Sequence, residues 1–133
     1  MGQGAFAAMR TICAAELGLP EELIRVTEVD TALVADSGPT VASRATHSGG
    51  QATIDAARQI KARFGDIAAD LLGAGSHEEV VCAGGNYRKV EDMEGPSVTW
   101  QEVVSELYLR KINPAALGWF RSKDRPYDEA TGQ

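Results

Sequence analysis

The strongest constraint on the fold is a long run of helical periodicity in the middle of the chain. Apolar side chains recur there at steps of three and four residues, so they share one face of a helix that begins after Gly49-Gly50. Gly65 lies inside the run, and either kinks the helix or divides it in two. A helix with one apolar face must bury it against other elements. The face comprises Ile54, Ala57, Ile60, Phe64, Ile67, Ala68 and Leu71.

The first third of the chain predicts a helix, a strand and a long loop. A half-buried helix is predicted over Ala5–Leu17, with Gly18 placed to end it. Residues 24–29 alternate apolar and polar side chains and include β-branched residues, which predicts a strand. Residues 31–48 show no sustained period and contain Ser37-Gly38-Pro39, so we expect a loop, and loops of this length are usually functional or disordered.

The last third predicts a hairpin and a helix. Residues 79–83 and 87–90 are β-rich runs separated by Gly84-Gly85-Asn86. Thr99 and Glu102 have the spacing of a capping box that opens an amphipathic helix. The alternation of helices with short strands predicts an α+β fold, with helices packed on short mixed strands.

We expect residues 1–133 to form a single α+β fragment of a domain, in which 121–133 is an extended tail. The chain opens at a glycine turn and closes on Thr131-Gly132-Gln133, with no obvious capping element at either end. An intact domain usually begins and ends with secondary structure that completes its core, so this pattern favours a piece of a larger domain.

Charge and composition exclude several classes of protein. The formal charge of −6, from 19 acidic and 13 basic side chains, argues against nonspecific nucleic-acid binding. No segment has the apolar length of a membrane span, and the start lacks the features of a signal peptide, so we expect a cytoplasmic protein. Cys13 and Cys82 have no paired spacing, which favours buried reduced thiols over a disulfide or a zinc site.

Two glycine-containing segments are candidates for ligand binding. The Gly2-Gln3-Gly4 turn offers close backbone approach, a side-chain amide and free helix-end N–H groups, which suit a polar heterocycle or an anion. Taken alone this signal is weak, because a glycine turn before a helix is more often only a turn.

The second candidate is the loop from Ser37 to Thr46. Its hydroxyls, its backbone amides and Arg44 can grip a phosphate, while Ala42 leaves room for a bulky group. The competing interpretation is a solvated loop with Arg44 on the surface.

No catalytic arrangement and no metal ligand are evident. His47 and His77 are about thirty residues apart without neighbouring ligands, which favours surface or capping roles. Trp100, Trp119 and Phe120 are expected to pack rather than to form a stacking platform. The residues alone therefore predict a small-ligand or phosphate-binding α+β domain.

Three stretches resemble the molybdopterin-binding subunit of xanthine dehydrogenases and aldehyde oxidases. They are MGQGAFAAMRTICAAELGLPEELIRV, TALVADSGPTVASRATHSGGQATIDAA and GWFRSKDRPYDEATGQ. The resemblance covers essentially the whole chain and is weakest between Gly73 and Leu117. It implies that the pterin cofactor is contacted by Gly2, Gln3 and Gly4, and by Thr40, Val41, Ala42, Ser43 and Arg44.

The same resemblance implies an oxidative hydroxylation of a purine, heteroaromatic or aldehyde substrate. Molybdenum is held there by the cofactor's dithiolene sulfurs, which agrees with the missing ligand cluster. Electrons leave through iron-sulfur and FAD subunits or domains, and a glutamate base lies in a later segment without a counterpart before Gln133. We therefore expect the isolated chain to be inactive and without cofactor, and its partners to include the remaining molybdopterin-binding segments.

Two other functions remain open. The fragment can fold alone as a non-catalytic interaction domain, dimerising through surface that missing parts would cover. A generic phosphate or nucleotide binder built on the Gly49-Gly50 helix end ranks last, because no lysine-bearing phosphate loop supports it.

Overall fold

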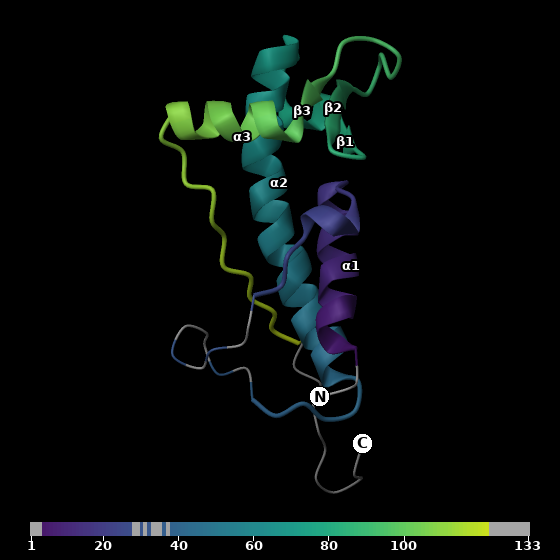
Figure 1. The fold of residues 1–133 in the computed structure, drawn as a ribbon, viewed down its shortest axis with the longest axis vertical. Coiled ribbons are helices and arrows are strands. Elements are labelled where there is room, and N and C mark those ends of the chain that lie inside the picture. Colours follow the sequence, from purple (N-terminus) through teal and green to yellow (C-terminus); the bar gives the residue numbers. More distant parts are fainter. Residues whose placement is uncertain (1–3, 28–29, 31, 33–35, 37, 123–133) are drawn as a thin grey trace, which may run out of the picture.

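The computed structural model describes residues 4–27, 30, 32, 36 and 38–122. Within them, three α-helices and one three-stranded sheet are arranged around a long central helix (Figure 1). The elements are α1 (Ala5–Leu17), α2 (Gly50–Leu72), β1 (Val80–Ala83), β2 (Asn86–Lys89), β3 (Val98–Thr99) and α3 (Trp100–Leu109). The predicted α+β class is confirmed.

Helix α2 is unbroken, so Gly65 does not divide it. The glycine instead provides room for the turn His77–Glu79, since a Cβ at Gly65 would lie 2.8 Å from the Cβ of His77. The helical path also begins earlier than predicted. Arg44 is already helical, and a π-helical turn over Ala45–Gly49 leads directly into α2. The predicted loop 31–48 therefore ends at Ser43.

Helices α1 and α2 lie side by side and run in the same direction (Figure 1). Their contact begins where the Thr53 hydroxyl donates to the Met9 sulfur at 3.3 Å, and it continues to Glu16, which pairs with Arg58 at 3.3 Å. Gly50 permits this approach, because a Cβ there would lie 3.1 Å from the Ile12 side chain. Both helices consequently begin at the same end of the molecule.

The predicted hairpin is present as β1 and β2, which pair antiparallel and place Val80 opposite Lys89. Its two-residue turn, Gly84-Gly85, has positive φ at both positions (59° and 82°), as the twist of a tight hairpin requires. Strand β3, which was not predicted, extends the sheet by pairing with β2. The sheet is fixed to α1 because the Gly85 amide donates to the Gly18 carbonyl at 3.2 Å.

The core lies where the sheet and α3 cover the carboxyl half of α2. Trp100 packs there as predicted, tilted on Phe64 with ring centroids 4.7 Å apart and stacked on Tyr87 at 6.1 Å. Helix α3 opens with the predicted capping box, in which Thr99 and Glu102 bond each other's backbone amides. Val103 and Leu107 are fully buried on its inner face.

After α3, residues 112–122 form an extended segment that turns back along α2 (Figure 1). We call residues 112–120 the strap. It descends from the sheet end of α2 to the end where α1 and α2 begin. Residues 121 and 122 lack regular structure, and the remainder of the predicted tail lies outside the described residues.

The strand predicted over residues 24–29 is wrong for its described part. Glu21–Leu23 forms a helical turn, and residues 24–27 follow without strand pairing. Ile24 has the extended dihedrals of a strand (φ −95°, ψ 113°), but the described residues place no neighbouring strand beside it. An alternating pattern yields a strand only where backbone partners are available.

Candidate functional site

The common starting end of α1 and α2 is the first element of the candidate site. Gly4 precedes α1 in a left-handed conformation (φ 71°), and among the residues that the structure describes no side chain caps the helix. Arg44, which precedes the π-helical turn Ala45–Gly49, likewise makes no side-chain cap. Neither first turn contains an acidic residue. Helix-start N–H groups carry partial positive charge and lack helical acceptors, so this end can bind an anion or a polar heterocycle.

The second element is the loop that leads into α2. Gly38 is left-handed (φ 74°), and its amide donates to the Asp36 carboxylate at 2.7 Å. The guanidinium of Arg44 folds back over this turn and donates to the Pro39 carbonyl at 3.0 Å. Arg44 therefore organises the loop, and its five N–H donors exceed what this one bond uses.

Ala42 is the strained position of the loop. Its φ is 45°, a left-handed conformation that costs a non-glycine residue about 1 kcal/mol or more. Such strain is retained where surrounding structure or function requires a particular backbone path. The neighbouring residues Thr40, Val41 and Ser43 are exposed, so their hydroxyls and apolar surface are open to a ligand.

Gly49 and Gly50 do not form the phosphate loop considered from the sequence. Both lie inside the helical path, where Gly49 lies against Met9 and Gly50 against Ile12. Their role is close packing of two helices. The sequence suggested that the free N–H groups of a helix start would lie at these glycines. In the structure the first residue of the helical path is instead Arg44.

The strap supplies the third element. It brings Phe120 edge-on to His47, with ring centroids 5.4 Å apart and an interplanar angle of 79°. His47 belongs to the π-helical turn that follows the loop, and it lies on the surface as predicted. Trp119 is an exception to the expected packing, because 76% of its surface is exposed. The extended strap turns alternate side chains outward, so Phe120 packs while Trp119 does not.

The structure thus assembles residues from several of the sequence-predicted segments at one end (Figure 1). Gly4 and the loop Thr40–Arg44 lie where α1 and α2 begin, and the strap ends there. Gly2 and Gln3 lie outside the described residues. Sequence reasoning missed the polar side chains of α2 that hold the strap, although their spacing of four residues at positions 55, 59 and 63 was a readable signal.

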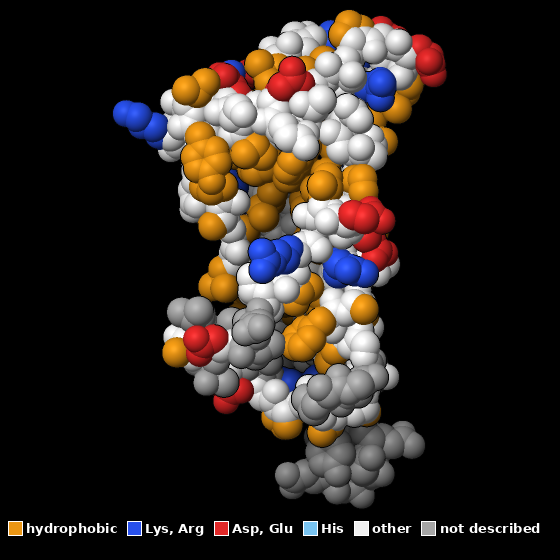
Figure 2. Space-filling view, viewed as in Figure 1, with side chains coloured by type: hydrophobic (Ala, Val, Ile, Leu, Met, Phe, Trp, Pro, Cys, Tyr) orange, Lys and Arg blue, Asp and Glu red, His pale blue; other side chains and the backbone are white. Residues whose placement is uncertain are grey.

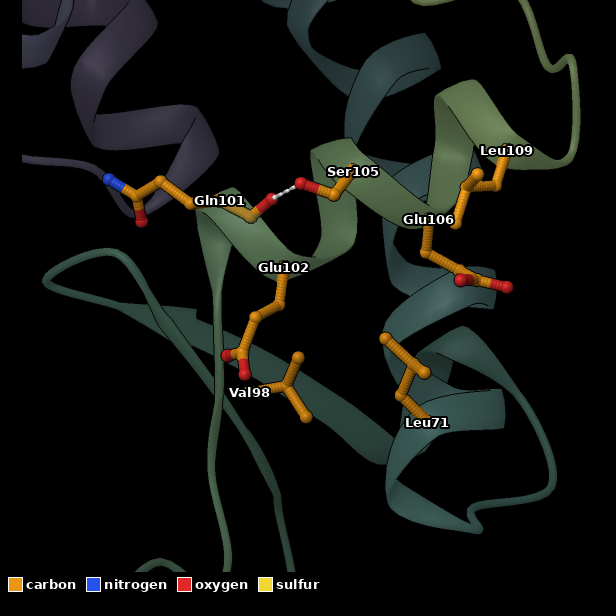
Figure 3. A pocket seen from close by; sticks show the side chains of 7 residues that line it. All are labelled: Leu71, Val98, Gln101, Glu102, Ser105, Glu106 and Leu109. Carbon is orange, nitrogen blue, oxygen red and sulfur yellow. Dashed lines mark hydrogen bonds between the residues drawn. The ribbon is translucent and has the colours of Figure 1, made fainter.

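Two surface hollows were considered as alternative sites. One, of about 420 Å³, lies beside α3 and contains two carboxylates, Glu102 and Glu106 (Figure 3). Both carboxylates have structural partners, since Glu102 caps α3 and Glu106 pairs with Arg110 at 2.7 Å. The other, of about 480 Å³, borders the first turns of α1 and includes Arg10 and Arg25. Neither presents a convergent catalytic group.

Titratable groups in the core have structural rather than chemical roles. Burial raises the pKa of the Cys82 thiol, and desolvation likewise raises the pKa of Tyr87 well above its ordinary value. Both groups are therefore neutral at physiological pH. Among the described residues, no group of three or more His, Cys, Asp or Glu side chains could hold a metal ion. No described helix is long and apolar enough to span a membrane.

Several known proteins are similar to this chain in sequence or in fold. A xanthine dehydrogenase of Calliphora vicina is 26% identical over 128 residues, covering 96% of this chain and 8% of its own. The carbon monoxide dehydrogenase large chain of Hydrogenophaga pseudoflava is 42% identical over 71 residues, or 53% of this chain and 9% of its own. The crystal structure of a Cu,Mo-containing carbon monoxide dehydrogenase in its carbon monoxide reduced state superimposes with a TM-score of 0.73, at 28% identity, over 90% of this chain and 15% of that one.

This chain accordingly spans less than a tenth of the length of the sequence relatives named above. The model of the molybdopterin cofactor-binding domain matches residues 1–133, the full length given. With a parallel helix pair whose starting ends are uncapped, and relatives among xanthine and carbon monoxide dehydrogenases, the chain belongs to the molybdopterin cofactor-binding domain family.

Proposed function

We propose that this chain is a cofactor-binding segment of a xanthine dehydrogenase-like molybdenum hydroxylase, and that its site is the end where α1 and α2 begin. The contacts are Gly2, Gln3 and Gly4 before α1, and Thr40, Val41, Ala42, Ser43 and Arg44 before α2. The observation that carries the proposal is the parallel packing of two uncapped helix starts beside this loop.

The residues fit the molybdenum cofactor. A molybdopterin presents a polar heterocycle and a phosphate, which need hydrogen-bond donors and a positive local field rather than metal ligands. The described donors here are helix-start amides, the hydroxyls of Thr40 and Ser43, and the Arg44 guanidinium. When bound, the cofactor supplies molybdenum held by its own dithiolene sulfurs, so the protein need not provide a ligand cluster.

The finer features of the proposal follow the family. The substrate is a purine, a heteroaromatic compound or an aldehyde, and the complete enzyme includes the remaining molybdopterin-binding segments with iron-sulfur and FAD subunits or domains. The chain is cytoplasmic, and by itself it is inactive and holds no cofactor. A general base supplies about 10²-fold or more in such proton transfers, and no residue of this chain is assigned that role.

The test is molybdenum and pterin analysis of the chain purified alone and after co-expression with the polypeptides encoded beside it. Molybdenum in the co-purified complex, near one atom per chain, supports the proposal. Its absence from both samples, with the chain recovered folded, contradicts it. The non-catalytic alternative then gains weight, and the oligomeric state of the isolated chain in sedimentation becomes its direct readout.

A further inference from the structure

A row of polar side chains on α2 holds the strap in place. Asp55, Gln59 and Arg63 lie at successive steps of four residues, so they share one ridge of the helix. The Trp119 amide donates to the Asp55 carboxylate at 3.0 Å, and the Gln59 amide donates to the Leu117 carbonyl at 3.1 Å.

Within this row, Arg63 makes two hydrogen bonds to the strap, whereas Asp55 and Gln59 make one each. Its Nη1 donates to the Asn113 carbonyl at 2.5 Å, and its Nη2 donates to the Ala115 carbonyl at 2.9 Å. The Nε group donates to the Gln59 carbonyl of its own helix at 3.1 Å, which fixes the direction of the guanidinium. With its Nε group fixed in this way, the planar guanidinium can bond the carbonyls of two residues that are two positions apart in an extended chain, because these carbonyls point to the same side.

Close approach of the strap also depends on Gly118. A Cβ at this position would overlap the Ala52 carbonyl oxygen and lie 2.9 Å from the Ala56 nitrogen. The strap therefore touches α2 backbone to backbone, at a point where only glycine fits. Two independent features, a polar row and a side-chain-free contact, serve the same placement.

We propose that Asp55, Gln59 and Arg63 are positioning residues for the cofactor end: by fixing the strap along α2, they hold Phe120 against His47 and so restrain the start of α2 and the Thr40–Arg44 loop. The contacts of these three residues with the strap are called the clamp below, and they are contacts within this chain alone. The positioning role of the clamp rests on the proposed function, because the loop that it restrains is the proposed cofactor contact.

Hydrogen–deuterium exchange of the 133-residue chain tests the clamp without cofactor. Arg63→Ala, and independently Gly118→Ala, should speed exchange about tenfold in peptides covering 113–122 and also raise it in peptides covering 40–48. Arg58→Ala is the matched control, since it removes an arginine of the same helix that pairs with Glu16 instead. Leu117→Ala, at a side chain 82% exposed, is the control within the strap.

Asp55→Asn retains an acceptor for the Trp119 amide and should keep the protection that Asp55→Ala loses. Faster exchange in 113–122 with unchanged 40–48 would show that the strap is only a surface element, and would overturn the positioning role. Unchanged exchange in both regions would overturn the clamp.

A second readout separates the clamp from the proposed function. In the molybdenum-loaded complex, Arg63→Ala should lose molybdenum about threefold faster than Arg58→Ala. Thermal unfolding of both variants shows whether they differ in stability, so that the rate of molybdenum loss can be compared between equally stable proteins. Equal rates overturn the positioning role. A wild-type complex without molybdenum contradicts the proposed function, and the exchange result on the clamp is unaffected.

Discussion

At its carboxyl end α2 is covered by the sheet and α3, and most of the buried core cluster belongs to that end. At its amino end α2 meets α1 and the loop 38–43, whose described residues are exposed and include the left-handed Ala42. Hydrophobic side chains gather beneath α3 in the space-filling view (Figure 2). The difference indicates that the two ends of α2 have different roles. The packed end, at its carboxyl terminus, holds the helices in position, and the open end, at its amino terminus, is available to a ligand.

The helix starts show the same contrast. Helix α3, at the packed end, has a complete capping box of Thr99 and Glu102. Helix α1 and the helical start at Arg44, at the open end, have neither a side-chain cap nor an acidic residue in the first turn. A cap typically contributes about 1 kcal/mol, so its absence from two adjacent helix starts is a cost that ligand binding can offset.

The sharpest test of this contrast compares the two left-handed glycines that bracket α1. Gly18→Ala places a Cβ against the backbone carbonyl of Cys82, at the packed end, and should cost about 4 kcal/mol of unfolding free energy. Gly4→Ala meets open space and should cost only about 1 kcal/mol, from its φ of 71°. Urea denaturation measures both. Equal costs would remove the distinction between the ends.

A cavity in the core should be nearly as damaging. Leu107→Ala removes a fully buried side chain of α3 and should cost about 3 kcal/mol, measured by the urea midpoint. Leu109→Ala on the same helix removes a side chain that is 77% exposed, and Val41→Ala in the open loop one that is 55% exposed. Both should stay within about 0.5 kcal/mol. A comparable loss in Val41→Ala would mean that the loop is part of the core.

Relief of strain at the open end should have a small effect of opposite sign. Ala42→Gly removes the left-handed penalty but adds backbone entropy to the unfolded chain, so the net change should lie between zero and a gain of about 0.5 kcal/mol. Thermal unfolding is sensitive enough to detect it. A loss above about 1 kcal/mol would contradict the assignment of strain.

The smallest expected effect is a pH dependence at the packed end. Hydrogen bonds from Thr99 lower the pKa of Glu102 in the folded chain, so its contribution to stability is present above the ordinary carboxyl pKa and is lost as the pH falls through the folded value. Glu102→Gln keeps an acceptor in the capping box but does not titrate there. The stability difference between wild type and Glu102→Gln should shrink in acid. A difference that grows as the pH falls would reverse the sign.

Much of the fold could be predicted from local signals. The bounds of α1, the Gly84-Gly85 hairpin and the Thr99–Glu102 cap follow from residue types a few positions apart. The strand expected at residues 24–29 failed because pairing depends on a partner that the local sequence does not contain. The start of α2 at Gly50 agrees with the prediction, but the helical turn that precedes it from Arg44 was not predicted, because Gly49-Gly50 locally indicate a helix start.

The candidate site was predictable only in pieces. Resemblance pointed to Gly4 and to Thr40–Arg44, but their assembly at one end depends on the parallel packing of α1 and α2. The position of the strap was not predicted, because its contacts with Arg63 span about fifty residues and no local signal indicates them.

The most direct test of the account compares two serine-to-alanine changes, one at each end, in the chain co-expressed with its neighbouring polypeptides. Ser43→Ala removes a hydroxyl of the proposed contact loop, whereas Ser105→Ala removes one that only bonds the Gln101 carbonyl of α3. Molybdenum per chain should fall several-fold in Ser43→Ala, for a lost hydrogen bond worth about 1 kcal/mol, and stay at the wild-type level in Ser105→Ala. Equal molybdenum in the two variants would contradict the placement of the cofactor at the open end.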